Sequence, residues 1–271
     1  IIEVLFMFPC TPLVVALTEK IIPGEDQKVH HNELQYITEI SLKSPATMIP
    51  QAKNELKRMA DMAQENLDRS IKGFLNQSDE YLNKIYHREE DINNVSHAIT
   101  DYLVKSNQLS LPLADQKILG SMFYVVNDIE RIGDHAENFA DYTKTELKHN
   151  TGLTGDAKEE IKKMYEAVSK LLKLSLESFM AQDGVNTQED KLAEIAALEA
   201  SIDKMERRYQ KHHIKRLAKG DCEPRAGLLF SDMLSELERI ADHSVNIAYS
   251  MSDEDEDEIL AAESEALTAK N

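Results

Sequence analysis

Two short motifs hold the residues best suited to bind a ligand in this chain of 271 residues. The motifs Glu130-Arg-Ile-Gly-Asp-His135 and Glu238-Arg-Ile-Ala-Asp-His243 share five of six residues at a spacing of 108. In each, a glutamate and an aspartate lie four residues apart, so on a helix both carboxylates point to the same side. Two carboxylates on one side of a helix can bind one cation together.

A second repeated pair of acidic positions precedes these motifs. Glu89 and Asn93 match Glu199 and Asp203 at a spacing of 110. Because 49 of the 271 residues are acidic, a single pair means little, and the argument rests on repetition at equivalent places. The predicted metal ligands are Glu89, Glu130, Asp134, Glu199, Asp203, Glu238 and Asp242.

Carboxylate ligands of this kind suit Mg²⁺, Ca²⁺, Mn²⁺ or iron. A half-buried carboxylate must bind a cation, take a proton or form an ion pair, because burying an unpaired charge costs free energy. Ion pairing is therefore the alternative, as is a helical scaffold without metal. Arg131 and Arg239 follow the glutamates directly and point about 100° away, so we expect them to pair with another helix or with the other bundle. We expect His135 and His243, one residue off the acidic side, to be ordinary surface or core residues.

The elements that must position these residues are long helices. A third repeated block, residues 52–59 and 157–164, lies before the others, so three blocks recur in one order and indicate an internal duplication. In each copy, apolar residues spaced by three or four predict three helices. The predicted fold is all-α, with two tandem three-helix bundles related by a pseudo-twofold axis. The helices of the second copy are predicted at about 154–183, 187–219 and 225–252.

The predicted organisation has five parts. Residues 1–24 are expected to end a transmembrane segment, because Ile1 to Leu17 is nearly all apolar; an apolar terminus packed on the domain is the alternative. A connector follows over 25–45, in which 30–44 is ambiguous. The first bundle is predicted at 46–150 and the second at 151–252. The last part, 253–271, begins with six consecutive acidic residues and is expected to be a solvated tail.

Composition excludes several classes of function. The net charge of −18 makes nucleic acid an unlikely partner, because binding a phosphate backbone needs clustered Lys and Arg. The nine glycines and seven prolines are too few for the turns of a many-stranded β fold. Phosphate-binding loops, dinucleotide glycine motifs and nucleophile elbows are absent from the sequence, so we expect no enzyme. Cys10 and Cys222 form no paired motif, which indicates a reducing compartment.

The duplicated motifs at 130–135 and 238–243, on two three-helix copies, resemble the PhoU domain over about residues 46–252. The resemblance implies that the acidic motifs bind metal ions, which are often iron or zinc, with Mg²⁺ or Mn²⁺ as further candidates. Asn93 departs from the family pattern, because an acid is expected there, and it leaves the first site one charge weaker.

Sodium-dependent phosphate cotransporters of bacteria often end in a PhoU-like domain directly after their last membrane helix, and residues 12–24 resemble that junction. The prediction is therefore the cytoplasmic regulatory domain of a sodium/phosphate symporter, which modulates phosphate uptake. It implies a location at the cell membrane with the helical domain on the cytoplasmic side. The expected partners are the membrane, through the N-terminal segment, and the transmembrane domain of the transporter; a homodimer is also expected. The alternative is a stand-alone PhoU-type regulator that acts on a transporter and a sensor kinase.

Overall fold

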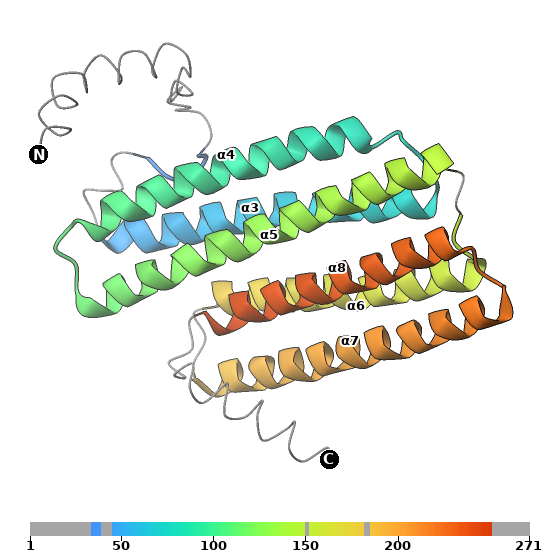
Figure 1. Ribbon diagram of the computed structural model, residues 1–271. Coiled ribbons are helices and arrows are strands. Elements are labelled where there is room, and N and C mark those ends of the chain that lie inside the picture. The colour runs from blue at the N-terminus through green and yellow to red at the C-terminus, as the bar shows by residue number, and fades with distance from the viewer. Residues whose placement is uncertain (1–33, 39–44, 150–151, 182–184, 251–271) are drawn as a thin grey trace, which may run out of the picture. The chain divides into compact units, whose positions relative to one another are not determined.

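The computed structural model describes residues 34–38, 45–149, 152–181 and 185–250 (Figure 1). Over these ranges the secondary structure is six α-helices without a strand, which confirms the predicted all-α class. The helices, labelled as in Figure 1, are α3 (Pro45–Leu75), α4 (Leu82–Asn107), α5 (Leu113–His149), α6 (Gly155–Met180), α7 (Val185–Lys219) and α8 (Pro224–Tyr249).

The helices bury the apolar residues that recur every three or four positions. In α3 this stripe includes Met48, Ala52, Leu56 and Met59, which are all at most 1% exposed. Local signals then set the helix ends. The side chain of Thr154 accepts a hydrogen bond from the backbone nitrogen of Ala157 at the start of α6. Gly220 takes a positive φ of 74° directly after α7, a conformation that glycine adopts without steric cost.

The six helices form two groups of three. Helices α3, α4 and α5 pack on one another, as do α6, α7 and α8, and the groups meet where α5 packs on α8 and α3 on α6 (Figure 1). The three helices of the second copy lie close to their predicted ranges. The duplication and the domain boundaries of the two copies stay predictions, because the arrangement of helices does not show a common origin.

Some predictions concern segments outside the described residues. The predicted membrane segment 1–24 and the tail 253–271 lie there, as does most of the connector 25–45. Residues 34–38 are held against α3, because a carboxylate oxygen of Glu55 accepts hydrogen bonds from the backbone nitrogens of Gln35 and Tyr36 at 2.9 and 2.7 Å. Over the ranges that the structure covers, every helix is too short or too polar to span a membrane.

Candidate functional site

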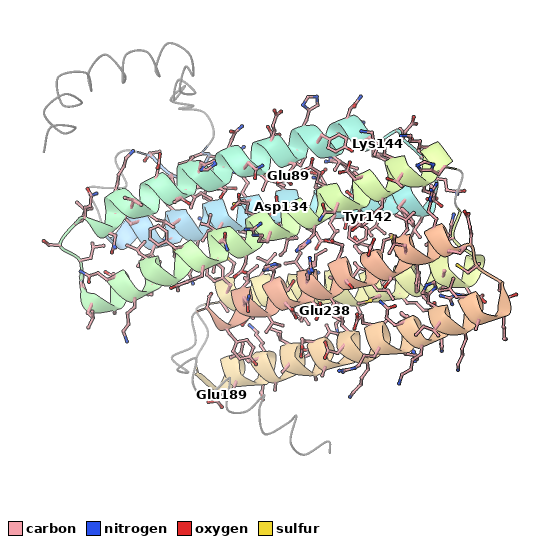
Figure 2. All side chains as sticks on the ribbon, in the orientation of Figure 1. Glu89, Asp134, Tyr142, Lys144, Glu189 and Glu238 are labelled. Atoms are coloured by element: carbon pink, nitrogen blue, oxygen red, sulfur yellow. The ribbon has the colours of Figure 1, made fainter. Side chains whose placement is uncertain are left out.

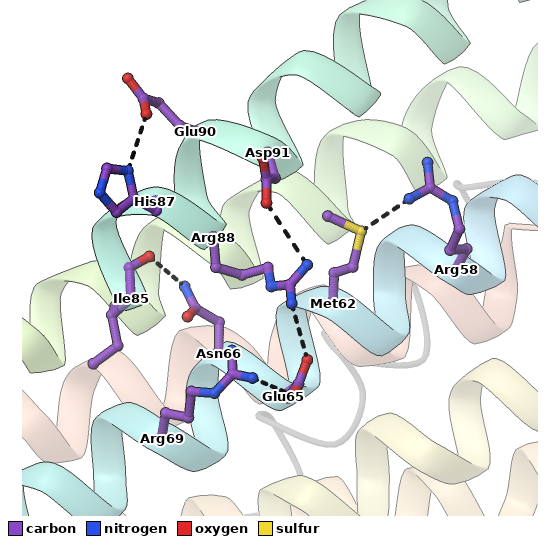
Figure 3. Close-up of polar contacts among 10 residues, drawn as sticks. All are labelled: Arg58, Met62, Glu65, Asn66, Arg69, Ile85, His87, Arg88, Glu90 and Asp91. Carbon is purple, nitrogen blue, oxygen red and sulfur yellow. Dashed lines mark hydrogen bonds and ion pairs between the residues drawn. The ribbon is translucent and has the colours of Figure 1, made fainter. Parts of the chain in front are cut away.

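Polar contacts with α3 fix the register of α4, which carries Glu89 (Figure 3). The side-chain amide of Asn66 donates to the backbone oxygen of Ile85 at 3.1 Å. One residue before Glu89, Arg88 forms an ion pair with Glu65 of α3 at 3.4 Å. These contacts lie between α3 and α4. The side chain of Glu89 lies against Gly133 of α5.

Glu89 is buried against the backbone of α5. It is 3% exposed, and both of its carboxylate oxygens are buried without a hydrogen-bond partner. The close approach is possible because residue 133 is glycine: a Cβ at Gly133 would lie 2.7 Å from one carboxylate oxygen of Glu89. A carboxylate in such a position is strongly destabilised as an anion.

Three further acids of α5 surround Glu89. Burial raises its pKa to about 8, and repulsion from Asp134, Glu137 and Glu130 adds to the effect. The pKa of Glu137 is itself raised, first by burial and then by Asp141 and Asp134. At neutral pH Glu89 therefore carries a proton unless a cation replaces it. The predicted ligands Glu89, Glu130 and Asp134 are thus brought together between α4 and α5, where Figure 2 labels Glu89 and Asp134.

The second group of three helices holds a looser acidic cluster between α7 and α8. Burial raises the pKa of Glu238 to about 6, followed by repulsion from Asp242, Glu206 and Asp203. Asp203 accepts a hydrogen bond from Arg207 on its own helix at 3.2 Å, so part of its charge is already paired. Of the predicted ligands in this copy, Asp203 and Asp242 lie close enough to Glu238 to act on it, and Glu199 is half-buried on α7 one turn before Asp203.

The two groups meet in a reciprocal set of contacts between α5 and α8. His135 Nδ1 lies 2.5 Å from an oxygen of Glu236, and His243 Nδ1 lies 2.8 Å from an oxygen of Asp128. The two imidazole rings are 5.5 Å apart. Burial pushes the pKa of Glu236 up, but hydrogen bonds from His135 and Asn138 outweigh it and hold that pKa below its usual value. These contacts between α5 and α8, called here the α5–α8 crossing, hold the two helices in one position relative to each other.

Sequence reasoning missed the carboxylates of this crossing. Asp128 and Glu236 are separated by 108 residues, the same spacing as the two acidic motifs, so the repeat could have revealed them. The prediction that His135 and His243 are ordinary residues overlooked this pairing. The prediction for Arg131 was wrong, since it pairs with Asp134 on its own helix at 3.2 Å. The flexible arginine side chain extends along its own helix to a carboxylate three residues later, a spacing at which side chains of one helix are neighbours.

The geometry leaves the metal hypothesis as a prediction. Among the described residues, no group of three or more His, Cys, Asp or Glu side chains is arranged to hold a metal ion. The donors do fit a hard cation, because the unpartnered carboxylate of Glu89 and its acidic neighbours offer only oxygen ligands. A cation bound there would be held by Glu89, Glu130 and Asp134 and would neutralise their mutual repulsion.

Comparisons with known proteins point to one family. The chain is 20% identical over 196 residues to the phosphate-specific transport system accessory protein PhoU homolog 1 of Thermotoga maritima, covering 72% of this chain and 82% of that protein. It is 23% identical over 199 residues to the phosphate-specific transport system accessory protein PhoU homolog of Clostridium acetobutylicum, covering 73% of this chain and 87% of the relative.

Solved structures show the same fold. PhoU from Pseudomonas aeruginosa superimposes with a TM-score of 0.67 at 20% identity, over 76% of this chain and 96% of that one. The phosphate transport system regulatory protein PhoU from Streptococcus pneumoniae gives a TM-score of 0.66 at 20% identity, over 77% and 95% of the two chains.

The predicted location at the cell membrane is wrong. It rested on the apolar residues 1–24 and on a resemblance to symporters that end in this domain. The relatives that match most of the chain are instead named accessory proteins of a transport system. Among the helices that the structure describes, none meets the length and hydropathy that a membrane span requires. An apolar run alone was too weak a basis for the prediction, because apolar residues also occur where chains pack.

The match to a family model covers both groups of helices. The model of the PhoU domain matches residues 56–143, from α3 to α5, and residues 161–251, from α6 past the end of α8. Together the two ranges include both acidic motifs and the residues of the α5–α8 crossing. This chain therefore belongs to the PhoU domain family.

Proposed function

We propose that this protein is a PhoU-type regulator that acts on a separate phosphate transporter and its sensor kinase. The observation that carries the proposal is the family match over both groups of helices, together with relatives named as accessory proteins of phosphate-specific transport. The sequence alternative of a stand-alone regulator has more support than the symporter domain, because the named relatives are accessory proteins.

The structure supports a binding role. The described residues are long helices whose interior is filled with side chains, and the unpaired polar groups of Glu89 lie between two helices. In this proposal the helices present surfaces to the partner proteins, while the acidic clusters between α4 and α5 and between α7 and α8 respond to cations. Regulation would then be exerted through binding.

The test measures phosphate uptake in the source organism with its gene for this chain deleted. Uptake of radiolabelled phosphate is followed in cells moved from low to high phosphate. We expect the deletion strain to fail to reduce uptake at high phosphate and the wild-type gene to restore the response. Pull-down of the tagged full chain under both conditions, followed by mass spectrometry, identifies the bound transporter and kinase.

Two results would contradict the proposal. An unchanged uptake response in the deletion strain excludes regulation of phosphate transport. A changed response with neither a phosphate transporter nor a sensor kinase in the pull-down excludes the proposed partners.

A further inference from the structure

The outward side of α7 carries a row of exposed basic residues, most of which form no ion pair within the described residues. This row, called here the basic stripe, consists of Lys204, Arg207, Arg208, Lys211, Lys215 and Lys219, all of which are exposed. The opposite side of α7 is buried and includes Ile195, Ile202 and Tyr209. Among the described residues the four lysines form no ion pair, whereas Arg207 pairs with Asp203. In Figure 2, nitrogen-tipped side chains project from the outer edge of α7.

An exposed aliphatic side chain lies within the basic stripe. Ile214 is 62% exposed, although it is flanked by lysines along the same side. Leu228 of α8 is 64% exposed near the same end, where Gly227 lies against His213 and Leu217 of α7. Exposed apolar side chains surrounded by charge are typical of protein interaction surfaces.

The fold itself does not require the basic stripe. Helix α4 occupies the same position in the first group of helices, and the spacing of 110 aligns it with α7. It carries Asn94, His97 and Asp101 where α7 carries Lys204, Arg207 and Lys211. The aliphatic position is kept, because Val104 aligns with Ile214 and is 46% exposed. Lys105 aligns with Lys215, so one charge is shared, and the other five basic residues of the stripe occur only in the second group.

The complementary chemistry is present in the sequence. Residues 253–258 are six consecutive acids, and Ile259 and Leu260 follow them directly. Such a segment matches both the charge of the basic stripe and its exposed aliphatic residue. We propose that the basic stripe binds the acidic segment 253–260 of a second copy of this chain.

The length of the chain favours a second copy over the same one. The hydroxyl of Tyr249 contacts the backbone oxygen of Leu192, which places the end of α8 beside the first half of α7. Lys211 lies nineteen residues beyond Leu192 on α7, or about 28 Å along the helix. A fully extended chain advances at most about 3.6 Å per residue, so Asp253 reaches about 14 Å from Tyr249.

Within one chain, only the last acids of the run could then reach the middle of the basic stripe. The segment would also have to pass the acidic first half of α7, which includes Glu189, Asp190 and Glu194. Repulsion between like charges opposes that path. A second copy can approach the stripe from outside and meets neither restriction.

The test follows the association of the full chain by sedimentation velocity. At low ionic strength we expect a reversible dimer. The variant K211E/K215E/K219E and the tail variant D253N/E254Q/D255N/E256Q/D257N/E258Q should each weaken the dimer by about tenfold or more, and salt near 1 M should do the same, because the Debye length falls to about 3 Å. The control K84E/K105E/K117E reverses three exposed lysines outside the stripe and should leave the dimer unchanged.

Mixing the two defective variants separates the two arrangements. In a reciprocal dimer the intact stripe of one variant can bind the intact tail of the other, so the mixture should regain association. A wild-type chain that stays monomeric, or a stripe variant that dimerises like wild type, overturns the proposal. So does a mixture that remains monomeric, because an intact stripe of one chain would then not bind the intact tail of the other.

Discussion

Glu89 shows how a single buried side chain can make a helical bundle sensitive to its surroundings. Its carboxylate lies against the backbone of α5 without a hydrogen-bond partner, and three acids of that helix repel it. Other buried acids are satisfied differently. Glu55 accepts two backbone hydrogen bonds, and Glu236 accepts hydrogen bonds from His135, Asn138 and Tyr142. The contrast singles out Glu89 as the acid that a proton or a cation must neutralise.

The raised pKa of Glu89 predicts that the free energy of unfolding falls as pH rises. Its pKa of about 8 in the folded chain lies above the ordinary value of 4.5. The folded state therefore holds a proton that the unfolded state has lost, so its stabilising effect is complete below pH 4.5 and disappears as pH rises through 8. Between these limits the slope contributed by this group approaches about 1.4 kcal/mol per pH unit.

The measurement is urea unfolding of wild type and Glu89→Gln from pH 5 to pH 9. Glutamine has the shape of the protonated acid, so we expect a flatter profile for the variant and a stability above that of wild type at pH 9. Parallel profiles for the two proteins would show that Glu89 does not titrate in this range.

At the scale of helices, side-chain size decides how closely neighbours approach. Gly133 lets α4 bring Glu89 against α5, whereas the equivalent residue of the second motif is Ala241. At the α5–α8 crossing the helices are joined by longer side chains, because two histidines form hydrogen bonds with carboxylates of the opposite helix. The apolar stripes predicted all these helices well, because burial of one side of a helix follows from its period of 3.6 residues.

Gly133→Ala tests the close approach of α4 and α5. Its methyl group would lie 2.7 Å from Glu89 and 3.3 Å from Ile92, so one helix must move. We expect a loss of about 1–3 kcal/mol in the free energy of unfolding, as is usual for overpacked cores. Gly120→Ala on the same helix is the control, since its methyl group would meet nothing within 4 Å. That control should gain up to about 1 kcal/mol from helix propensity. Equal effects of the two substitutions would show that the helices are not in tight contact at Gly133.

At the scale of the whole molecule, the net charge of −18 is unevenly distributed. Six acids stand together at 253–258, two clusters lie between helices, and the basic stripe occupies the second half of α7. Burial raises the pKa of Glu89 and of Glu238, and repulsion between the acids of each cluster raises it further. A multivalent cation would relieve this repulsion in each half of the molecule.

Divalent cations are therefore expected to raise the melting temperature. We expect Mn²⁺ or Zn²⁺ to stabilise wild type by linkage, because a ligand that binds only the folded state shifts unfolding. E130Q/D134N and E238Q/D242N should each lower the number of ions bound in equilibrium dialysis. D61N/D101N, which removes two exposed charges elsewhere, should leave binding unchanged. If both cluster variants bind as many ions as wild type, the acidic motifs are not the metal ligands.

The sequence by itself determined the helices and the set of acids to inspect. The spacing of apolar residues along a helix and the residues that end a helix are local features of the sequence. Helices α3 to α8 could therefore be predicted from that spacing and from helix-ending positions such as Pro112 and Gly220. The repeat also marked Glu130 and Glu238 as equivalent. The location at the membrane could not be inferred, because an apolar run does not distinguish a span from a packed terminus.

The tertiary structure decided which of these acids are buried beside other negative charges and which have hydrogen-bond partners. Glu89 and Glu236 have the same side chain, yet the pKa of the first is raised and that of the second lowered. The difference arises from partners about 40 residues away for Glu89 and about 100 residues away for Glu236. Helix periodicity fixes the side on which a residue lies but not the helix it meets there, and the local charge and hydrogen-bond donors of that neighbour set its protonation.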